Sequence, residues 1–507
     1  MNLKIALCHL NVRYKKSAIN RRSIVRLTKR AAGAGANIVV HTEAAVSGYG
    51  FESLEDVEPY AETINGTTIS LMSEMAKSLG IYLVLGWIEK DPATGIFYNA
   101  ASAIDPKGEV VCHVRKINAE SRWARPGPSA QDPTFDTRWG RIGILICSDS
   151  YFGLMPRTLA LKDVDLLLVP ANWPMSGIDP SQIWRVRAME NGFYLAACNR
   201  TGVDRVMECR SALSCAFDPH GKPLLSLSGK HSRVGMVDIP LKNGRIPSQN
   251  RRAALAPRQP AVYRPIYLDM RHAQNIGQWY DLPKPGQLSV TAFCHEEKGA
   301  PPYDVLFATN KKDGFVLWPE SVSHSPHQIR QAASDTARKT QKAVAASYRK
   351  NDRKVLIFAD KNGKLFQTKP LHGDQKPAGK IEDRIFDIPG ARIALADPED
   401  MIHPEMAVAY SKLGCDLVAV SGGKIGDKYH ALLSARSVEQ VFVAVAGWDR
   451  AFICRPPRGH ERWREKAKTG TGKVSDIINT KRTREKKFPE RMDYSTLLAL
   501  SAPKENQ

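Results

Sequence analysis

Short apolar runs and stretches of helical spacing alternate along the first part of the chain. Each apolar run has the length of a buried strand, and the helical stretches end near glycines or polar turns. The predicted strands lie at 4–10, 38–41, 81–87, 97–100 and 108–111, and the predicted helices follow the first strand up to Gly33 and cover 68–79. Helices alternate with strands at first and hairpins enter later, which predicts an α/β sandwich whose central sheets are covered by helices.

A strongly apolar strand is predicted over 141–147, and it ends in a polar turn at 148–150. An amphipathic helix follows to about residue 162, and a further strand covers 165–169. Cys147 therefore lies where a strand passes into a helix.

This strand–turn–helix–strand unit occurs twice. Residues 392–396 and 415–420 match its two strands at one common offset, and 436–442 matches 187–193 at nearly the same offset. Extended backwards, the repeat pairs 5–9 with 291–295 and Thr42-Glu43 with Pro319-Glu320. Matches in one order indicate a duplication.

The repeat sets the predicted domains. The first covers 1–270, a Pro-, Arg- and Gln-containing linker covers 271–286, and a second, shorter copy covers 287–455. The charged run after it lacks a sustained apolar period, so residues 456–507 are predicted to form a basic tail that is either mobile or draped over a partner.

Three chemically distinctive residues follow one another in the first copy. Glu43 stands at a strand end, Lys116 lies in His-Val-Arg-Lys-Ile-Asn, and Cys147 lies in Gly-Ile-Leu-Ile-Cys-Ser-Asp. Their order and spacing resemble the Glu–Lys–Cys triad of the nitrilase superfamily, the carbon–nitrogen hydrolases. Further matching motifs are Gly48-Tyr49, Arg125-Pro-Gly127, Val169–Asn172, Arg187–Asn191, Asn199–Gly202 and Phe217–Gly221. The resemblance covers nearly all of 1–270 and implies an α-β-β-α sandwich, here in two tandem copies.

The chemistry of these residue types fits that resemblance. A cysteine is the least handicapped nucleophile near neutral pH, and the helix after Cys147 favours a thiolate. Glu43 would take the thiol proton, pass it to the leaving amine and then activate water. Lys116, with the backbone N–H of Ser148, would stabilise the oxyanion.

Other residues are candidates for supporting roles. Two interpretations of Glu120 stay open: it matches the second glutamate of the family, which positions the lysine, or it lies on a solvated helix face. Tyr49, Trp173 and Pro174 are predicted to line the substrate pocket, with plain loop packing as the alternative for each.

Two departures from the family pattern carry information. His41-Thr42 stands where Phe-Pro is more common before the glutamate, which changes the expected shape of the pocket. Cys147-Ser148-Asp149 looks like the Cys-x-Asp of amidases and N-carbamoyl amide hydrolases, whereas nitrilases proper tend to have Cys-Trp-Glu. The resemblance therefore favours an amide or ureido substrate over a nitrile.

The second copy lacks the nucleophile. The repeat carries Cys147 onto Pro398, while Glu320 and Lys369 are expected to remain. Asp397 or Asp400 could act on a substrate in principle, but an acidic cluster after a strand more often begins a helix. We expect a degenerate domain that supports the first as the partner in an intrachain pseudo-dimer.

Composition and charge exclude several classes. The 507 residues are 43% hydrophobic and 25% charged, which is typical of soluble globular proteins. No apolar stretch is long enough to span a membrane and no signal peptide is evident, which predicts a cytoplasmic protein. The 9 cysteines are scattered without CxxC or CxxH spacing, so we expect neither disulfides nor a metal, and no organic cofactor is implied.

The leading hypothesis is a cysteine-dependent hydrolase of a small amide or N-carbamoyl compound, assembled as a homo-oligomer. The alternatives are a nitrilase acting on a nitrile, a catalytically silent ligand-binding or scaffold protein, and a nucleic-acid-associated protein. The net charge of +21 raises the last alternative, but no nucleic-acid module accompanies the basic run at 481–487.

Overall fold

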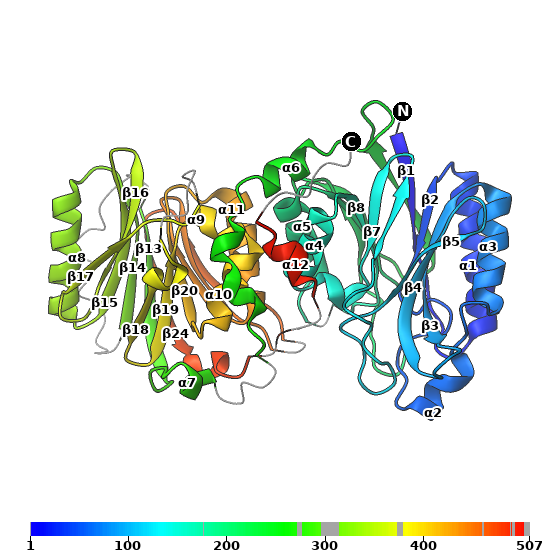
Figure 1. The fold of residues 1–507 in the computed structure, drawn as a ribbon, viewed down its shortest axis with the longest axis horizontal. Coiled ribbons are helices and arrows are strands. Elements are labelled where there is room, and N and C mark those ends of the chain that lie inside the picture. The colour runs from blue at the N-terminus through cyan, green and yellow to red at the C-terminus, as the bar shows by residue number, and fades with distance from the viewer. Residues whose placement is uncertain are drawn as a thin grey trace. The chain divides into compact units, whose positions relative to one another are not determined.

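The computed structural model describes residues 2–175, 177–270, 276–295, 314–372, 379–458, 461–486, 488 and 492–500. The chain forms two compact units, Met1–Ala256 with Arg491–Leu497, and Pro257–Glu490 with Leu498–Gln507 (Figure 1). This division lies before the predicted domain end at residue 270, so residues 257–270 belong to the second unit. Residues 271–275 of the predicted linker lie outside the described residues, and its later part holds α7 (Ile276–Trp279).

The first unit holds two six-stranded sheets. Their strands are β1 (Asn2–His9), β2 (Ile38–His41), β3 (Tyr82–Lys90), β4 (Phe97–Ile104), β5 (Val110–Arg115), β6 (Thr134–Thr137), β7 (Gly140–Ile144), β8 (Val164–Pro170), β9 (Tyr194–Cys198), β10 (Ser214–Phe217), β11 (Pro223–Leu227) and β12 (Arg233–Pro240). The helical segments are α1 (Ser17–Gly33), α2 (Leu54–Val57), η1 (Glu58–Tyr60), α3 (Thr67–Leu79), η2 (Cys147–Ser150), α4 (Leu154–Leu161), α5 (Pro180–Asn191) and α6 (Gln249–Leu255), with α12 (Tyr494–Leu498) near the C-terminus.

The strand order explains where the strand ends meet. One sheet runs β12-β1-β2-β3-β4-β5 and the other β11-β10-β9-β8-β7-β6. The central strands β1, β2 and β3 are parallel, as are β7, β8 and β9, and hairpins flank both sets. Parallel neighbours end at the same sheet edge, so residues that follow β2, β7 and β8 gather at the carboxyl ends of the strands.

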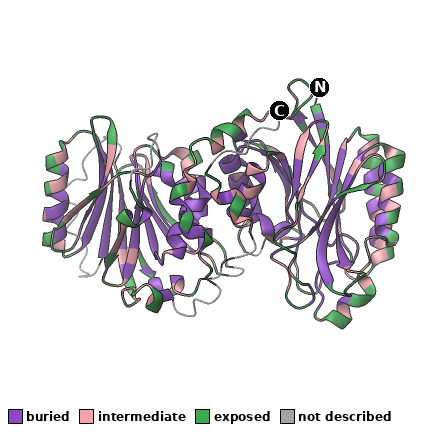
Figure 2. Cartoon of the chain, in the orientation of Figure 1, coloured by how far each residue is buried: buried purple, intermediate pink, exposed green. Residues whose placement is uncertain are grey.

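Helices cover the outer face of each sheet (Figure 1). Helix α1 buries Ile24, Leu27 and Ala31 at helical spacing, and a shared apolar core joins the inner faces of the two sheets. Figure 2 shows buried strands next to α1 and α3, whose outer faces are exposed, and α4 and α5, which are mostly buried. The predicted α-β-β-α sandwich is thus confirmed.

The second unit repeats this architecture. Its strands are β13 (Gln287–Cys294), β14 (Gly314–Ser321), β15 (Ala343–Lys350), β16 (Arg353–Ala359), β17 (Leu365–Thr368), β18 (Ile385–Ile388), β19 (Ala391–Ala396), β20 (Leu417–Ser421), β21 (Phe442–Ala446), β22 (Arg450–Arg455), β23 (Arg464–Thr469) and β24 (Gly472–Asn479). Its helical segments besides α7 are η3 (Pro260–Val262), η4 (Arg264–Tyr267), α8 (Pro326–Thr340), η6 (Ile381–Arg384), α9 (Pro398–Met401), α10 (Pro404–Lys412), α11 (Gly426–Ala435), η7 (Arg436–Glu439) and η8 (Thr480–Thr483). The sheets run β17-β16-β15-β14-β13-β24 and β18-β19-β20-β21-β22-β23, which confirms the tandem arrangement.

The prediction that residues 456–507 form a mobile tail is wrong for much of that segment. Strand β24 pairs with β13 along its whole length, and β23 pairs with β22. Buried Asp416 then accepts hydrogen bonds from Thr483 at 2.6 Å and Arg484 at 2.7 Å. The segment therefore completes both sheets of the second unit. Residues 459–460, 487, 489–491 and 501–507 lie outside the described part.

Removing these strands should unfold the second unit. A chain that ends at residue 456 would leave β13 and β22 as unpaired apolar edges. We expect rapid proteolysis between 287 and 455, measured by limited trypsin digestion and mass spectrometry, while a control chain that ends at residue 500 resists. Equal resistance of both chains would contradict the assignment.

Within the described residues, none of the helices combines the length and apolar character that crossing a membrane requires.

Candidate active site

Glu43 lies just after β2 and is fully buried. Its position depends on Gly86 of β3, because a Cβ at residue 86 would lie 2.6 Å from the Glu43 Cα. Oxygen Oε1 of Glu43 accepts from Lys116 Nζ at 2.6 Å and from Asn99 Nδ2 at 2.7 Å. Oxygen Oε2 is buried and receives no nitrogen or oxygen donor among the described residues. One oxygen is thus saturated, and the other is available.

Lys116 follows β5 and is 2% exposed. Its backbone N–H donates to Asn99 O at 2.7 Å, and its carbonyl accepts from Gly127 N at 2.8 Å. Gly127 lies so close to the Arg115 backbone that a Cβ would be 2.3 Å from the carbonyl oxygen, which accounts for glycine in Arg125-Pro-Gly127. The lysine is therefore fixed along its backbone as well as at its amine.

Cys147 begins the tight turn η2 after β7. Its φ is +49°, in the left-handed region that a side chain rarely adopts. Ser150 Oγ donates to the Cys147 carbonyl at 2.6 Å and accepts from Trp184 Nε1 at 2.8 Å. Such a strained strand-to-helix turn, held by buried partners, is typical of a positioned nucleophile.

The three side chains influence one another electrostatically. Burial and the Glu43 carboxylate raise the pKa of the Cys147 thiol well above its usual value, while Lys116 and the backbone N–H of Asn172 lower it. Burial disfavours the ammonium of Lys116, but the charges of Glu43 and its neighbours outweigh burial and hold its pKa well above the usual value. Lys116 is therefore a permanent cation between a carboxylate and a thiol.

Asp149 connects the turn at Cys147 to the segment after Lys116, a role that the sequence did not reveal. Its carboxylate accepts from Asn118 N at 2.7 Å, Ile117 N at 3.1 Å and Asn118 Nδ2 at 3.0 Å. The second residue after Cys147 thus holds the two residues that follow Lys116. The only signal in the sequence was the Cys-x-Asp pattern itself.

The buried Asp149 predicts a pH effect on stability. Burial raises its pKa to about 6, above the value of an exposed aspartate. The folded state therefore holds this proton more tightly than the unfolded state, so stability falls as pH rises from about 4 to about 6. The test is the urea midpoint of the wild type minus that of Asp149→Asn, which cannot titrate at this position. This difference should decrease between about pH 4 and about pH 6 and be constant above about pH 7. A constant difference would contradict the assignment.

The residues predicted to line the substrate pocket are Tyr49, Trp173 and Pro174. The Tyr49 ring lies 5.5 Å from Lys116 Nζ, so Tyr49 borders the triad. The half-buried Trp173 ring lies 5.9 Å from that of Tyr151, and Pro174 beside it is also half-buried. Both follow Asn172, whose N–H faces Cys147.

Glu120 and Ser148 also make contacts that the sequence did not specify. The Glu120 carboxylate accepts hydrogen bonds from Arg122 at 3.0 Å, whereas Lys116 donates from Nζ to Glu43 Oε1 and from its backbone N–H to the Asn99 carbonyl. The Ser148 hydroxyl donates to Asn118 O at 3.3 Å, a bond within the framework. Arg122 and, to a smaller extent, Lys116 lower the pKa of the Glu120 carboxyl, so the role of Glu120 in positioning the lysine stays a prediction. Asn99, which sequence reasoning missed, shares the acceptor oxygen with Lys116.

The departure at His41-Thr42 also has a structural reason. His41 Nε2 lies 2.8 Å from Thr28 Oγ1, and burial lowers the pKa of His41 to about 3, so its ring is neutral. The Thr42 hydroxyl donates to the Ala171 carbonyl of the other sheet. The residue before the glutamate thus connects the two sheets next to the site.

The second unit shows how its copy of the site has changed. Asp400 accepts from the backbone N–H groups of Leu371 and His372 at 2.8 Å, as Asp149 does from Ile117 and Asn118. This register places Pro370, rather than Lys369, at the lysine position. Lys369 is exposed, so the expectation that it was retained is wrong.

In the second unit, a different lysine, Lys354, lies next to Glu320, which corresponds to Glu43 of the first unit. Lys354 Nζ lies 2.7 Å from Glu320 Oε2 and also contacts Asp397. Lys354 on β16 is the cross-strand partner of Arg349 on β15. In the first unit, Asn99 on β4 is the cross-strand partner of Ile88 on β3, so Lys354 lies on the strand that corresponds to the strand of Asn99. The second unit therefore keeps a buried glutamate–lysine pair and has prolines in place of the other two triad residues.

Known proteins with similar sequences or folds were found for about half of this chain. The family model described as "Carbon-nitrogen hydrolase" matches residues 4–245. A nitrilase of Pyrococcus abyssi is 31% identical over 255 residues, which are 49% of this chain and 95% of that protein. Omega-amidase NIT2 of Mus musculus is 32% identical over 254 residues, 47% of this chain and 89% of that protein. The crystal structure of Saccharomyces cerevisiae Nit3, described as a member of branch 10 of the nitrilase superfamily, has a TM-score of 0.45 and 22% identity over 50% of this chain and 93% of that chain.

The family match and the two relatives define the class: the chain belongs to the carbon–nitrogen hydrolases of the nitrilase superfamily. Within that class, it is a hydrolase whose matched domain lies in the first unit and whose second unit repeats the fold.

Proposed function

We propose that the first unit hydrolyses a small amide or N-carbamoyl compound through a thioester on Cys147. The observation that carries the proposal is the difference in hydrogen bonding between the two carboxylate oxygens of Glu43. Lys116 and Asn99 both bind Oε1, while Oε2 is left without a nitrogen or oxygen donor among the described residues, and the carboxylate as a whole acts on the Cys147 thiol through its charge and a hydrogen bond. A buried carboxylate with one free oxygen next to a thiol is suited to proton transfer.

In the first half-reaction, the Cys147 sulfur attacks the carbonyl carbon while its proton passes to Glu43. The raised pKa of the thiol makes this base necessary, because little thiolate exists before substrate binds. Glu43 then gives the proton to the leaving nitrogen, the carbon–nitrogen bond breaks, and ammonia or an amine departs from the thioester.

Lys116 acts on the charge that develops in between. Its ammonium, with the backbone N–H of Ser148, stabilises the oxyanion of the tetrahedral intermediate. One such donor is worth about 10²- to 10³-fold in rate. In the second half-reaction, Glu43 takes a proton from water and the resulting hydroxide attacks the thioester carbon. The carbon–sulfur bond then breaks, the carboxylic acid departs, and Glu43 returns the proton to the Cys147 sulfur.

An amide or ureido substrate is favoured over a nitrile by Cys147-Ser148-Asp149. The similarity to omega-amidase NIT2 supports this choice, while the similarity to a nitrilase keeps nitrile hydrolysis as the second candidate.

Ammonia release separates the candidates. We would assay primary amides, ureido acids and nitriles against the full chain. Turnover of amides or ureido acids with little turnover of nitriles is expected. Preference for nitriles would overturn the substrate class, and inert behaviour with every substrate would favour a ligand-binding role.

The cytoplasmic location, the homo-oligomer and the intrachain pseudo-dimer remain predictions from the sequence.

A further inference from the structure

A buried ion pair lies in the loop after β9, outside the chemistry described above. Arg200 Nη2 is 3.1 Å from Asp204 Oδ2, and both side chains are 0% exposed. Burying two charges is costly unless their remaining hydrogen-bonding groups are satisfied. The partners of this pair therefore indicate what it holds in place.

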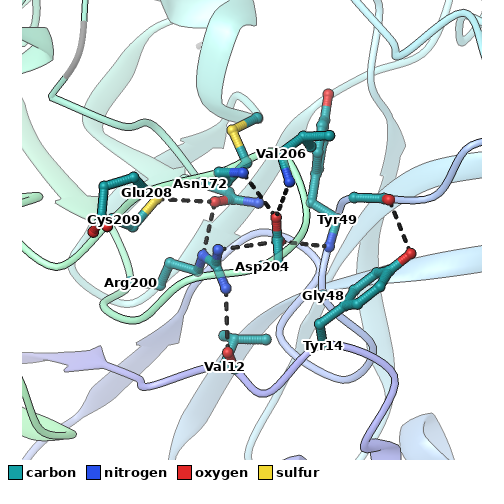
Figure 3. Close-up of polar contacts among 12 residues, drawn as sticks. Val12, Tyr14, Gly48, Tyr49, Asn172, Arg200, Asp204, Val206, Glu208 and Cys209 are labelled. Carbon is teal, nitrogen blue, oxygen red and sulfur yellow. Dashed lines mark hydrogen bonds and ion pairs between the residues drawn. The ribbon is translucent and has the colours of Figure 1, made fainter.

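Arg200 uses its guanidinium to bind two other loops (Figure 3). Nε donates to Asn172 Oδ1 at 2.8 Å, and Nη1 donates to the Val12 carbonyl at 3.2 Å. The Cys209 thiol also donates to Asn172 Oδ1, at 3.5 Å. Two donors on one oxygen fix the orientation of the Asn172 amide.

Asp204 accepts hydrogen bonds from the loop that contains Tyr49 and from the loop in which Asp204 itself lies. Oδ2 accepts from Tyr49 N at 3.4 Å, and Oδ1 accepts from Met207 N at 2.9 Å and Val206 N at 3.2 Å (Figure 3). Gly50 lies against this carboxylate, since a Cβ there would be 3.1 Å from Oδ1. The Tyr49 loop thus rests directly on Asp204.

These loops come from both sheets. Val12 follows β1 and Tyr49 follows β2 in one sheet, whereas Asn172 follows β8 and Arg200 follows β9 in the other. Glu43 follows β2 and Cys147 follows β7, so the ion pair spans the two sheets at the edge that carries the triad. The hydrogen bond from Thr42 to the Ala171 carbonyl crosses between the sheets at the same edge.

We propose that Arg200 and Asp204 are positioning residues, which hold the two sheets at the separation that proton transfer between Cys147 and Glu43 requires. The inference rests on the proposed function of the triad. It also assigns a task to Asn172, whose side chain Arg200 fixes and whose backbone N–H faces the sulfur. A displacement of about 1 Å at reacting groups can cost about 10²-fold in rate.

The test compares Arg200→Lys with Arg210→Gln. Lysine keeps the positive charge but cannot reproduce the three-way fork of bonds to Asn172, Val12 and Asp204. Arg210 belongs to the same loop but pairs with Glu208 at the surface, so its variant is a matched control. We would measure kcat and KM with the best amide, and the rate at which iodoacetamide alkylates Cys147 at about pH 8, with site assignment by peptide mass.

For Arg200→Lys, we expect kcat to fall about 10- to 100-fold with KM changed less than about threefold, and Cys147 alkylation to slow because the thiolate loses its Asn172 partner. Arg210→Gln should match the wild type. Wild-type kcat and alkylation in Arg200→Lys would overturn the proposal. Faster alkylation would also overturn it, since that indicates general loosening.

Should Arg200→Lys fail to fold, Thr42→Val decides the question. It removes only the hydroxyl bond to Ala171 and should lower kcat and alkylation in the same direction, whereas wild-type values would overturn the proposal. Cys147→Ala keeps the two proposals apart. If that variant retains turnover, the proposed function itself fails, whatever Arg200→Lys does.

Discussion

Replacing Cys147 by alanine is expected to abolish hydrolysis, lowering kcat by about 10⁴-fold or more. Without the sulfur no thioester forms, and the position equivalent to Cys147 in the second unit is Pro398, which cannot act as a nucleophile. Because alanine is slightly smaller and the site is buried, the fold should survive. The measurement is ammonia release under saturating substrate.

Cys112→Ala is the matched control for this variant. Cys112 is 6% exposed, as is Cys147, and lies in β5 of the same unit. Its loss should leave turnover near the wild-type value. Residual turnover of Cys147→Ala within about tenfold of the wild type would mean that another nucleophile performs the reaction.

Replacing Glu43 by glutamine should lower kcat by about 10²- to 10⁴-fold. Glutamine keeps the size of the side chain but cannot accept the thiol proton. Since the Glu43 charge raises the pKa of Cys147, its removal next to Lys116 should make the thiolate easier to form. We therefore expect turnover to fall while alkylation of Cys147 by iodoacetamide at about pH 8 becomes faster.

Glu320→Gln in the second unit is the control for Glu43→Gln. Glu320 is equally buried and also paired with a lysine, but Pro398 occupies the nucleophile position beside it. Turnover should be unchanged. A parallel loss of turnover and of alkylation in Glu43→Gln would contradict the role of a base, because it would indicate collapse of the site.

The triad region was predictable because strand ends are visible in a sequence. The apolar runs before Glu43 and Cys147 mark parallel strands, whose carboxyl ends meet at one edge. Lys116 required the resemblance to the nitrilase superfamily, since a lone lysine in a basic turn carries no signal of burial.

Residues that act across strands were not predictable in this way. Asn99 lies within a predicted hairpin, and its contact with Glu43 depends on the register between β3 and β4. Lys354 depends in the same manner on β15 and β16. The carboxylate of Asp149 looked like a marker of substrate class, although its hydrogen bonds are structural.

The error at the C-terminal strands has a different cause. Strand β24 alternates buried and exposed positions, but Asp476 is one of the buried ones, paired with Arg455 and Lys466 at 2.7 Å. All residues of β23 are exposed, so it shows no apolar alternation. An edge strand with charged residues resembles a solvated tail in sequence.

The most direct test of the central claim is the intact mass of the enzyme during turnover of its best amide, after rapid acid quench. The account predicts a mass increase equal to the acyl group, located by peptide mapping on Cys147, sensitive to hydroxylamine and absent in Cys147→Ala. Turnover without any acyl adduct on Cys147 under rapid quench, or an adduct on another residue, would contradict it.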